Sequence, residues 1–429
     1  MIYSIFNYTK LGLWGIIYYL KYKIYDVNDL LLLEIILNNI QNSNSLGTKC
    51  IQKLIPYLYL TKYDNEIIEL FKNTYENNLT HNLEYTKKIF KRDFNVNIED
   101  NYYIEESISS GSIGQVYKVR DKITNKTYAL KVKHPNIEFQ LSLIKKIVNF
   151  FDIPKYCVID INQFIKNFEI ETNFLIEGKN MKKFYDLYKE NAYIIIPEVY
   201  NYTNDIIIME YVEGVRVDTL SSYERNRYLT LFFIFCNNNK LINNFNHGDC
   251  HLGNFKKYDK DKIVIYDFGY CFTVEDEKIV KIIDDFWEII QDTGGCKYDY
   301  SFKECVEYIM KYNLYQFDIE YFQDDLEEYF YKPQREGKYF KSEDDLLINF
   351  IKLFTKRKLI FRMEYLNILL IYYHVSNYVD CDQRDLYAMC KYLDYFHEYQ
   401  EHLKLRIQYN YNITESVDND CLDELKKLI

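Results

Sequence analysis

Proline and glycine, the residues that most often interrupt regular structure, are scarce in this chain. It has only 5 prolines and 13 glycines in 429 residues, which favours long helices, above all in the C-terminal part. Basic residues are also in the minority, with 53 Lys and Arg against 64 Asp and Glu and a net charge of −11. Nucleic-acid binding is therefore not expected, because no excess of cations is available to neutralise phosphates.

Regularly spaced cysteines are missing as well. The 10 cysteines form no C-x-x-C pair, which predicts free thiols in a reducing, intracellular compartment. His247 and His251 flank Cys250, but no second Cys or His cluster stands at metal-ligand spacing. A zinc site is therefore disfavoured, and His247 is expected to shape the loop that contains it.

Near the N-terminus the apolar run is short. Residues 11–20 are mostly apolar, include Trp14 and lie between Lys10 and Lys21, but ten residues are too few to span a bilayer. Two interpretations remain open. The segment is either an interfacial helix, which predicts peripheral membrane contact, or a helix docked on the folded domain. No cleavable signal is expected, because no small-residue cleavage site follows.

The most informative segment lies near the middle of the chain. Residues 247–254 read HGDCHLGN, and a D-F-G sequence begins at Asp267. In phosphoryl transfer from ATP, an aspartate at the position of Asp249 orients or deprotonates the attacking hydroxyl. Asn254 and Asp267 stand where Mg²⁺ ligands are needed. The apolar run 262–266 predicts a buried strand that leaves Asp267 at its end, facing a cleft.

A loop of small residues lies upstream, between two strand-like runs. Against the kinase pattern G-x-G-x-x-G-x-V, the second and third glycines and the valine are present, and Ser109 replaces the first glycine. Small residues let backbone N–H groups approach phosphate oxygens; the alternative reading is an ordinary hairpin turn. The expected ATP-binding residues here are Ser109, Ser110, Gly111, Ser112, Ile113, Gly114 and Val116.

A lysine follows on the next predicted strand. Residues 128–132 alternate like a strand and place Lys131 between apolar neighbours, as in the kinase strand whose lysine holds the α- and β-phosphates. A buried ammonium needs a carboxylate partner. Glu171 and Glu177, on a helix-like segment, are the two contenders.

Two further apolar runs resemble the strand and hinge that meet adenine in kinases. They span residues 194–199 and 205–214. Residues 194–199 are expected to form a strand of the small lobe, and Met209 and Tyr211 to contact the nucleotide base. Loop, lysine, helix glutamate, hinge, catalytic aspartate and metal aspartate thus occur in the order that a kinase fold demands.

Together these segments resemble the UbiB/ADCK family of atypical kinase-like proteins, which is associated with coenzyme Q biosynthesis and lipid homeostasis. The family motifs H-x-D-x-H-P-G-N, A-A-A-S-I-A-Q-V, V-K-V-x-H-P-G-I and E-L-D-F-x-x-E-A-x-N are similar to residues 247–254, 109–116, 130–137 and 171–180. The resemblance implies a bilobal, protein-kinase-like α+β fold. It also implies that Glu177 is the carboxylate that pairs with Lys131.

The family carries a K-x-G-Q motif on an N-terminal helical extension that folds over the nucleotide site. Residues 46–52 resemble it: Lys49 and Gln52 are kept, while Ile51 replaces the glycine. The family's E-x-D becomes Glu171-Thr172-Asn173, and the alanine-rich loop becomes rich in Ser and Gly. These departures fall on the family's distinguishing elements, so ATP and Mg²⁺ binding is a firmer expectation than any family substrate.

The surroundings of the motifs argue against a regulated protein kinase. Gly248 stands where such kinases have an arginine before the catalytic Asp, and no A-P-E sequence follows Gly269. Thr273 is instead expected to cap a helix over residues 278–290. Little room remains for a peptide substrate, which favours a small or lipid-like acceptor, or ATP hydrolysis coupled to another process.

The sequence therefore predicts a helical extension over residues 1–98, a kinase-like small lobe over 99–214 and a helical large lobe over 215–429. The predicted function is that of an ATP-dependent phosphotransferase or ATPase whose acceptor is unknown. Two alternatives stay open. One is a pseudokinase that acts as a nucleotide-gated binding module, and the other is a small-molecule kinase of the aminoglycoside or choline type.

Overall fold

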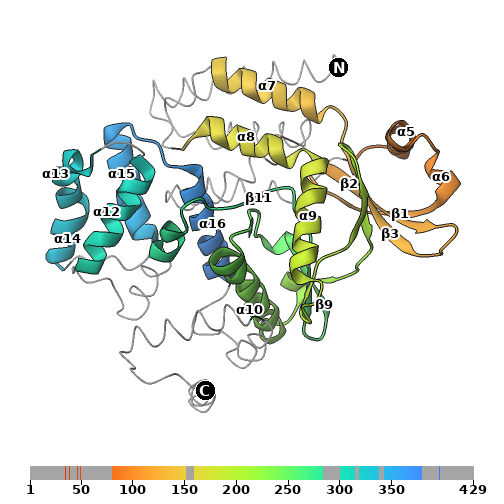
Figure 1. Ribbon diagram of the computed structural model, residues 1–429. Coiled ribbons are helices and arrows are strands. Elements are labelled where there is room, and N and C mark those ends of the chain that lie inside the picture. Colours follow the sequence, from red (N-terminus) through yellow and green to blue (C-terminus); the bar gives the residue numbers. More distant parts are fainter. Residues whose placement is uncertain are drawn as a thin grey trace, which may run out of the picture.

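The computed structural model describes residues 80–150, 159–283, 300–314, 318–337 and 343–378, together with Glu34, Asn38, Leu46, Lys49 and Phe396. These residues form a sheet-based part and a mostly helical part (Figure 1), which confirms the predicted α+β, kinase-like fold. The predicted extension over 1–98 lies mostly outside the described residues. Gln52 and the apolar segment 11–20 lie wholly outside them.

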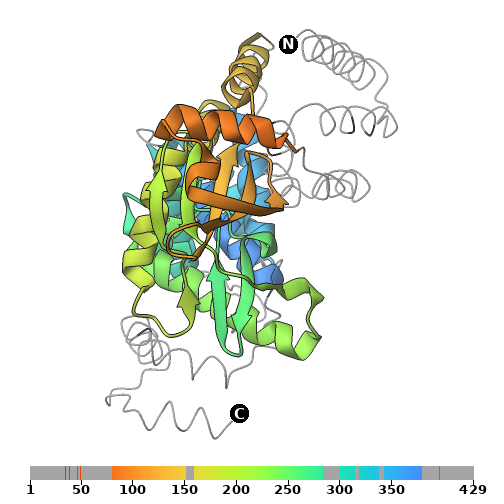
Figure 2. The same cartoon turned by 90° about the vertical axis from the view of Figure 1, so that its right-hand side faces the viewer.

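The small lobe is built on a five-stranded antiparallel sheet with the strand order β1-β2-β3-β6-β5. Its strands are β1 (Tyr102–Ser110), β2 (Gly114–Asp121), β3 (Thr127–Lys133), β5 (Val199–Tyr202) and β6 (Ile206–Glu210). One face packs against α5 (Leu83–Phe94), which Figure 2 shows in orange across the sheet. The short helix α6 (Ile98–Asn101) leads from α5 into β1.

Helix α5 shows how local sequence sets an element and its buried face. Asn82 caps its first turn by accepting a hydrogen bond from the Tyr85 N–H, and Asn95 ends it in the left-handed region at φ 58°. Ile89 and Phe90 are buried against the sheet. Burying one such side chain contributes about 1.5–3 kcal/mol, so this helix belongs energetically to the small lobe.

Three helices connect the two lobes. They are α7 (Ile137–Phe150), α8 (Ile161–Glu171) and α9 (Phe174–Tyr188). The buried face of α9 runs its whole length. Glu177 lies near its start, beside the small-lobe sheet, and Phe184 packs near its end against Phe245 and Phe268 of the large lobe. A charged residue on α9 therefore reaches the cleft from a helix that both lobes hold in place.

The large lobe contains two small sheets. One has the strand order β4-β10-β9-β7 and the other pairs β11 with β8. The strands are β4 (Ile194–Ile195), β7 (Val215–Arg216), β8 (Asn246–His247), β9 (Phe255–Asp259), β10 (Lys262–Ile265) and β11 (Cys271–Phe272). The prediction for residues 194–199 was wrong in part: β4 pairs in parallel with β10, and only Val199 continues into the small-lobe sheet.

The helices of the large lobe are α10 (Ser222–Asn238), α12 (Tyr300–Leu314), α13 (Gln323–Leu326), α14 (Lys332–Arg335), α15 (Glu343–Arg357) and α16 (Met363–Tyr378). They pack in two apolar cores, one shared by α12, α15 and α16 and the other containing α10. Short turns join them: the 3-10 helices η3 (Val217–Thr219), η5 (Leu252–Asn254) and η6 (Ile319–Phe322), and the π-helical turns η4 (Asn239–Asn243) and η7 (Glu327–Tyr331). Of the helices that the structure describes, none is both long and apolar enough to cross a bilayer.

The helix after the D-F-G sequence begins within one residue of its predicted start, but its cap is not the predicted one. It begins at Glu277, and Asp276 caps it by accepting a hydrogen bond from the Lys278 N–H at 3.1 Å. Thr273 is not the cap, because the extended strand β11 continues to Phe272 and the backbone turns only after Val274. The predicted end of this helix, residues 284–290, lies outside the described residues.

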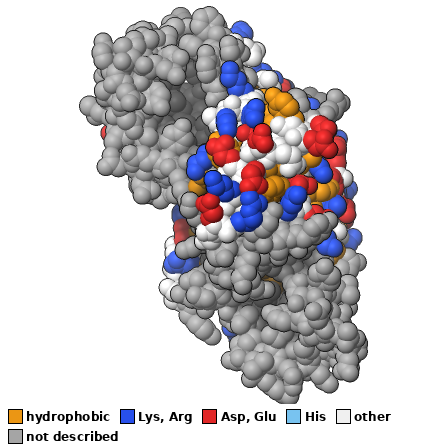
Figure 3. All heavy atoms as spheres, turned by 90° about the vertical axis from the view of Figure 1, so that its left-hand side faces the viewer, with side chains coloured by type: hydrophobic (Ala, Val, Ile, Leu, Met, Phe, Trp, Pro, Cys, Tyr) orange, Lys and Arg blue, Asp and Glu red, His pale blue; other side chains and the backbone are white. Residues whose placement is uncertain are grey.

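Both signs of charge alternate on the large-lobe face at the α13–α15 end (Figure 3). Arg335 pairs there with Glu327, and Lys356 lies 2.9 Å from Glu328. Such exposed pairs are screened by solvent and contribute little to stability. The described part of this face therefore presents no field of a single sign.

Candidate active site

The two-stranded β8–β11 ribbon brings the HGDCHLGN loop against the D-F-G sequence. His247, buried at the end of β8, donates its Nε2 proton to the Tyr266 carbonyl at 3.1 Å. Its Nδ1 is then an acceptor and takes the backbone N–H of Asp249 at 3.2 Å. The Asn254 side-chain amide donates to the Asp249 carbonyl at 2.8 Å and faces its Oδ2 at 3.3 Å. Two side chains thus hold the backbone of the predicted catalytic residue.

Asp267 follows β10 in an unusual backbone conformation. Its φ is 54°, in the left-handed region that Asp tolerates better than most residues and that is enriched at functional sites. The next residue, Phe268, is fully buried against Phe184. Asn180 of α9 donates to the Phe268 carbonyl at 3.0 Å. The side chain of Asp267 is therefore directed by a well-held turn.

Lys131 and Glu177 meet in the cleft. The Lys131 Nζ on β3 lies 2.5 Å from the Glu177 Oε1 on α9 and 3.7 Å from the Asp267 Oδ1. Burial lowers the pKa of Lys131, but the charges of Asp267 and Glu177 outweigh burial, and the net shift is upward. Burial alone would raise the pKa of Asp267; Lys131 and Lys49 reverse this and hold it well below its usual range. Lys131 and Asp267 are therefore both ionised at neutral pH.

Lys49 reaches the same cluster from the N-terminal part of the chain. Its Nζ lies 3.5 Å from the Glu171 Oε2, 3.8 Å from the Asp249 Oδ2 and 3.9 Å from the Asp267 Oδ2. Burial lowers the pKa of Lys49, but Asp267, Glu171 and Asp249 raise it far more. Glu171, the other contender for Lys131, is thus the partner of Lys49.

The charges of this cluster fit a bound divalent cation. Lys49 and Lys131 face four carboxylates, those of Glu171, Glu177, Asp249 and Asp267, which leaves a net charge of −2. Among the residues that the structure describes, no group of three His, Cys, Asp or Glu side chains is placed to hold a metal by itself. Mg²⁺ commonly takes one or two carboxylates and completes its shell with phosphates and water. Asp267 and Asn254 suit that mode.

The loop of small residues forms the tip of the β1–β2 hairpin. The Gly111 N–H donates to the Gly114 carbonyl at 2.9 Å, and Ser112 and Ile113 are buried beneath the turn. A side chain at Gly114 would meet the Val132 carbonyl at 2.8 Å, so the close approach of β3 requires glycine there. At Gly111 no such contact exists within 3.4 Å. The hairpin reading therefore accounts for Gly114, and phosphate binding stays a prediction.

The remaining predicted residues lie on strands of the small-lobe sheet or directly after them. Ser109 and Lys131 both lie opposite Val116, in the β1–β2 and β2–β3 pairs, and Ser110 follows at the end of β1. Met209, the next-to-last residue of β6, lies opposite Ala129. The ring of Tyr211 lies 4.9 Å from the Lys118 Nζ.

The predicted hinge is joined to the segment that precedes the predicted metal ligand. The Tyr266 hydroxyl donates to the Val212 carbonyl at 2.8 Å. Tyr266 immediately precedes Asp267, and Val212 follows Tyr211. This bond fixes the predicted adenine contacts relative to the predicted metal ligand.

Residues 77–296 match the ABC1 atypical kinase-like domain. This is half of the chain, and it includes all the predicted site residues except Lys49 and Gln52. The chain belongs to the ABC1 atypical kinase-like family. This family match and the relatives named AarF domain-containing kinases confirm the resemblance to UbiB/ADCK proteins.

Several relatives of the ABC1 domain are named as kinases. The Arabidopsis thaliana protein ACTIVITY OF BC1 COMPLEX KINASE 3 is 29% identical over 42% of this chain and 27% of its own length. The AarF domain-containing kinase 1 of Drosophila melanogaster is 26% identical over 49% of this chain and 45% of its own. The chain thus spans about a quarter to a half of the length of these relatives. The solved complex of Rv3197 with erythromycin from Mycobacterium tuberculosis covers 54% of this chain and 61% of its own, at 18% identity and a TM-score of 0.37.

Two histidines that sequence reasoning gave no role lie behind the hairpin of the ABC1 domain. The His134 Nε2 lies 2.9 Å from the Gly111 carbonyl, which can only accept, so His134 donates there. Its Nδ1 is then the acceptor for the His81 Nδ1 proton at 2.8 Å. The His81 Nε2 lies 2.9 Å from the Thr86 hydroxyl, which also bonds to the Tyr117 hydroxyl at 3.0 Å. Because the two Nδ1 atoms share one proton, the two rings of this relay cannot both be charged. Only the H-P pair at His134 was visible in the sequence motif.

The relay predicts an acid-sensitive small lobe. Burial, and then the neighbouring His134, lower the pKa of His81 from 6.5 to about 4. The unfolded chain therefore takes up a proton below about pH 6.5 while the folded chain does not, so stability falls as the pH drops from 6.5 toward 4. The melting temperature measured across this window should fall less steeply in His81→Asn. Parallel profiles for the two proteins would contradict the prediction.

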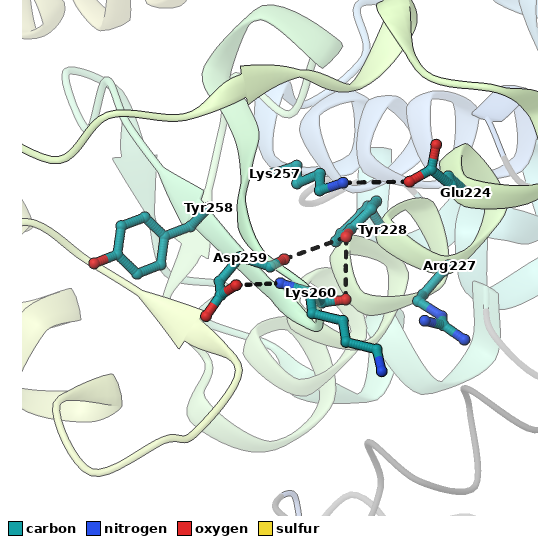
Figure 4. Close-up of a pocket in the computed structure, with 7 residues that line it drawn as sticks. All are labelled: Glu224, Arg227, Tyr228, Lys257, Tyr258, Asp259 and Lys260. Carbon is teal, nitrogen blue, oxygen red and sulfur yellow. Dashed lines mark hydrogen bonds and ion pairs between the residues drawn. The ribbon is translucent and has the colours of Figure 1, made fainter.

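A pocket of about 430 Å³ lies apart from these residues, between α10 and the β9–β10 hairpin (Figure 4). It is lined by Glu224, Arg227, Tyr228, Lys257, Tyr258, Asp259 and Lys260. Lys257 pairs with Glu224 at 3.3 Å, and Arg227 lies 3.3 Å from Asp261. None of the predicted site residues lines it, and these ion pairs already balance most of its charge. The predicted catalytic and metal-binding residues lie in the ion-pair cluster instead.

Proposed function

We propose that this ABC1 protein is an ATP-dependent phosphotransferase or ATPase that works with Mg²⁺. One observation carries the proposal: Lys131, Asp249 and Asp267, which are far apart in the sequence, share a single cluster of ion pairs bridged by Lys49. Isolated lysines and carboxylates are costly to bury. A cluster that buries several of them and keeps a net negative charge is typical of a site that receives a cation and phosphates.

Each residue has a role that follows from its chemistry. Lys131, held by Glu177, would contact the α- and β-phosphates, and Asp267 and Asn254 would hold Mg²⁺. Bound Mg²⁺ would neutralise negative charge on the phosphates. Asp249 would orient the acceptor hydroxyl or water and take its proton, and its backbone is held for this by His247 and Asn254.

The surroundings of Asp249 support a small acceptor. Lys49 occupies one side of the Asp249 carboxylate, with its Nζ 3.8 Å from Oδ2. Only a few residues separate Gly269 from the buried Val274 along the chain. The proposed acceptors are therefore a small or lipid-like molecule, a protein hydroxyl that fits this restricted approach, or water. The Lys49–Glu171 pair at 3.5 Å favours this assignment over a small-molecule kinase of the aminoglycoside or choline type.

A second candidate is a nucleotide-gated binding module with little turnover. The same Lys49 favours it, because an ammonium against Asp249 competes with any acceptor for that carboxylate. In this reading, bound nucleotide and Mg²⁺ change which charges pair within the cluster, and the output is an altered pairing of Lys49.

ADP release by the purified full chain tests the proposal. We expect turnover with Mg²⁺ and ATP, and its loss when a chelator removes the metal, because the cluster alone leaves carboxylate charge uncompensated. Addition of phospholipid or detergent tests whether a lipid-like acceptor raises the rate. Mg²⁺-dependent nucleotide binding without ADP release would favour the binding module, and the absence of both would contradict the two candidates together.

We also propose that the protein works in a reducing intracellular compartment. Cys236, Cys250 and Cys271 carry free thiols, and the Cys236 and Cys250 sulfurs approach to 3.7 Å without forming a disulfide. Peripheral membrane contact through residues 11–20 stays a proposal, which co-sedimentation with liposomes would test.

A further inference from the structure

Tyr270, the residue after the D-F-G sequence, is buried where the catalytic loop meets the metal-site loop. The Gly248 N–H donates to the Tyr270 carbonyl at 2.8 Å. The centroid of the Tyr270 ring lies 5.9 Å from that of the Phe272 ring. Tyr270 is only 7% exposed. Tyr270 therefore contacts the residue before Asp249 and lies three positions after Asp267.

The ring of Tyr270 explains why Gly248 has no side chain. A Cβ at Gly248 would lie 2.3 Å from the Tyr270 Cδ1 and 2.6 Å from its Cε1, distances at which the ring or the loop must move. Kinases controlled by phosphorylation of the activation loop use an arginine at this position, and that arginine can bind a phosphate. Here the same space is filled permanently by an aromatic ring.

The hydroxyl of Tyr270 is held from two helices. It accepts a hydrogen bond from the Asn167 amide of α8 at 2.8 Å and another from the Asn367 amide of α16 at 2.6 Å. Helix α8 ends at Glu171, the partner of Lys49. One side chain thus joins the metal-site loop, the catalytic loop, a helix of the Lys49 cluster and the core helix of the large lobe.

We propose that Tyr270 is a positioning residue that keeps Asp249 in register with Asp267 without any phosphorylation. The inference rests on the proposed function. Gly248 leaves the catalytic loop with unusual backbone freedom, and the Tyr270 carbonyl and ring restrict that freedom, while Asn167 and Asn367 fix the ring. A misplacement of about 1 Å can lower a rate by about 10²-fold, so modest loosening should be measurable.

Tyr270→Phe tests the proposal, because it keeps the ring and removes only the hydroxyl. The loss of two buried hydrogen bonds should lower kcat by about tenfold and leave the affinity for Mg-ADP within about twofold, since that affinity depends on Lys131 and Asp267. Hydrogen exchange over residues 246–254 should become faster in the nucleotide-free protein. Tyr312→Phe is the matched control: it removes a buried hydroxyl that donates to Glu364 at 2.6 Å, a residue outside the ion-pair cluster, and should change neither readout.

A second pair of variants tests the ring itself. Gly248→Ala should loosen the same peptide strongly in the wild-type background and much less in Tyr270→Ala, where the ring is absent. Unchanged exchange and kcat in Tyr270→Phe, or equal effects of Gly248→Ala in both backgrounds, would overturn the proposal. If the wild-type protein shows no turnover, the proposed function fails, while the exchange measurements still decide the role of Tyr270.

Discussion

Asp249→Asn is expected to lower ATP turnover by about 10²–10⁴-fold while the affinity for Mg-nucleotide stays nearly unchanged. Asparagine keeps the shape of the side chain but cannot take a proton from an acceptor hydroxyl or water. The loop should persist, because Asn254 and His247 bond mainly to the backbone of Asp249. Lys49 loses one carboxylate but keeps Glu171 and Asp267.

The measurement is ADP release at saturating Mg-ATP, with nucleotide affinity from calorimetry. Asp259→Asn is the matched control: the same chemical change, made at an exposed turn where the carboxylate accepts the Lys260 N–H at 2.7 Å. A rate for Asp249→Asn equal to that of the control would remove Asp249 from the chemistry. The cluster would then be a structural ion-pair network or a binding module.

Asp267→Asn is expected to act at an earlier step, on binding. Asp267 is the carboxylate that approaches both lysines, at 3.7 Å from the Lys131 Nζ and 3.9 Å from the Lys49 Nζ. Losing its charge removes a metal ligand, so Mg-nucleotide affinity should fall by about 10- to 100-fold, as for other charge-assisted contacts. Turnover should be lost with it. Nucleotide binding without Mg²⁺ should change much less.

The same substitution should change the pH dependence of stability. Because the pKa of Asp267 is held low in the folded state, its contribution to stability is present above its unfolded pKa and is lost as the pH falls through the folded value. Asp267→Asn should therefore melt at a lower temperature than the wild type at pH 7, and the two should converge in acid. Undiminished Mg-nucleotide affinity in this variant would contradict the metal assignment.

The two substitutions together test the site more sharply than either substitution does alone. Asp249→Asn should separate binding from turnover, whereas Asp267→Asn should remove both. If the wild-type protein binds Mg-nucleotide but releases no ADP, Asp267→Asn still weakens binding in the second candidate function, and Asp249→Asn has little effect.

Much of the site was predictable because its parts are local. The five-residue interval between Asp249 and Asn254 places both on one loop, where the Asn254 amide reaches the Asp249 carbonyl at 2.8 Å. The apolar run that became β10 ends just before Asp267, as its pattern indicated. Glu177 was selected over Glu171 by family resemblance alone; nothing in its local pattern distinguishes the two glutamates.

Other features depend on partners that sequence patterns do not name. An apolar run indicates a buried strand but not its neighbour, so β4 was expected in the small-lobe sheet and pairs with β10 instead. Thr273 and Asp276 are both good cap residues, and the reach of β11 decided between them. The bond between His81 and His134 joins residues 53 positions apart, and no periodicity links them.

The amino-acid sequence by itself determined the order of the kinase-like elements, the residues available for phosphoryl transfer and the absence of an arginine before Asp249. Short-range periodicity and spacing are enough for that, because they depend only on the geometry of strands, helices and loops. Only the tertiary structure decided which residues meet. It pairs the charges of Lys131 with Glu177 and of Lys49 with Glu171, and it packs the ring of Tyr270 against Gly248. Coulomb attraction and desolvation depend on distance and burial in space, which folding alone sets.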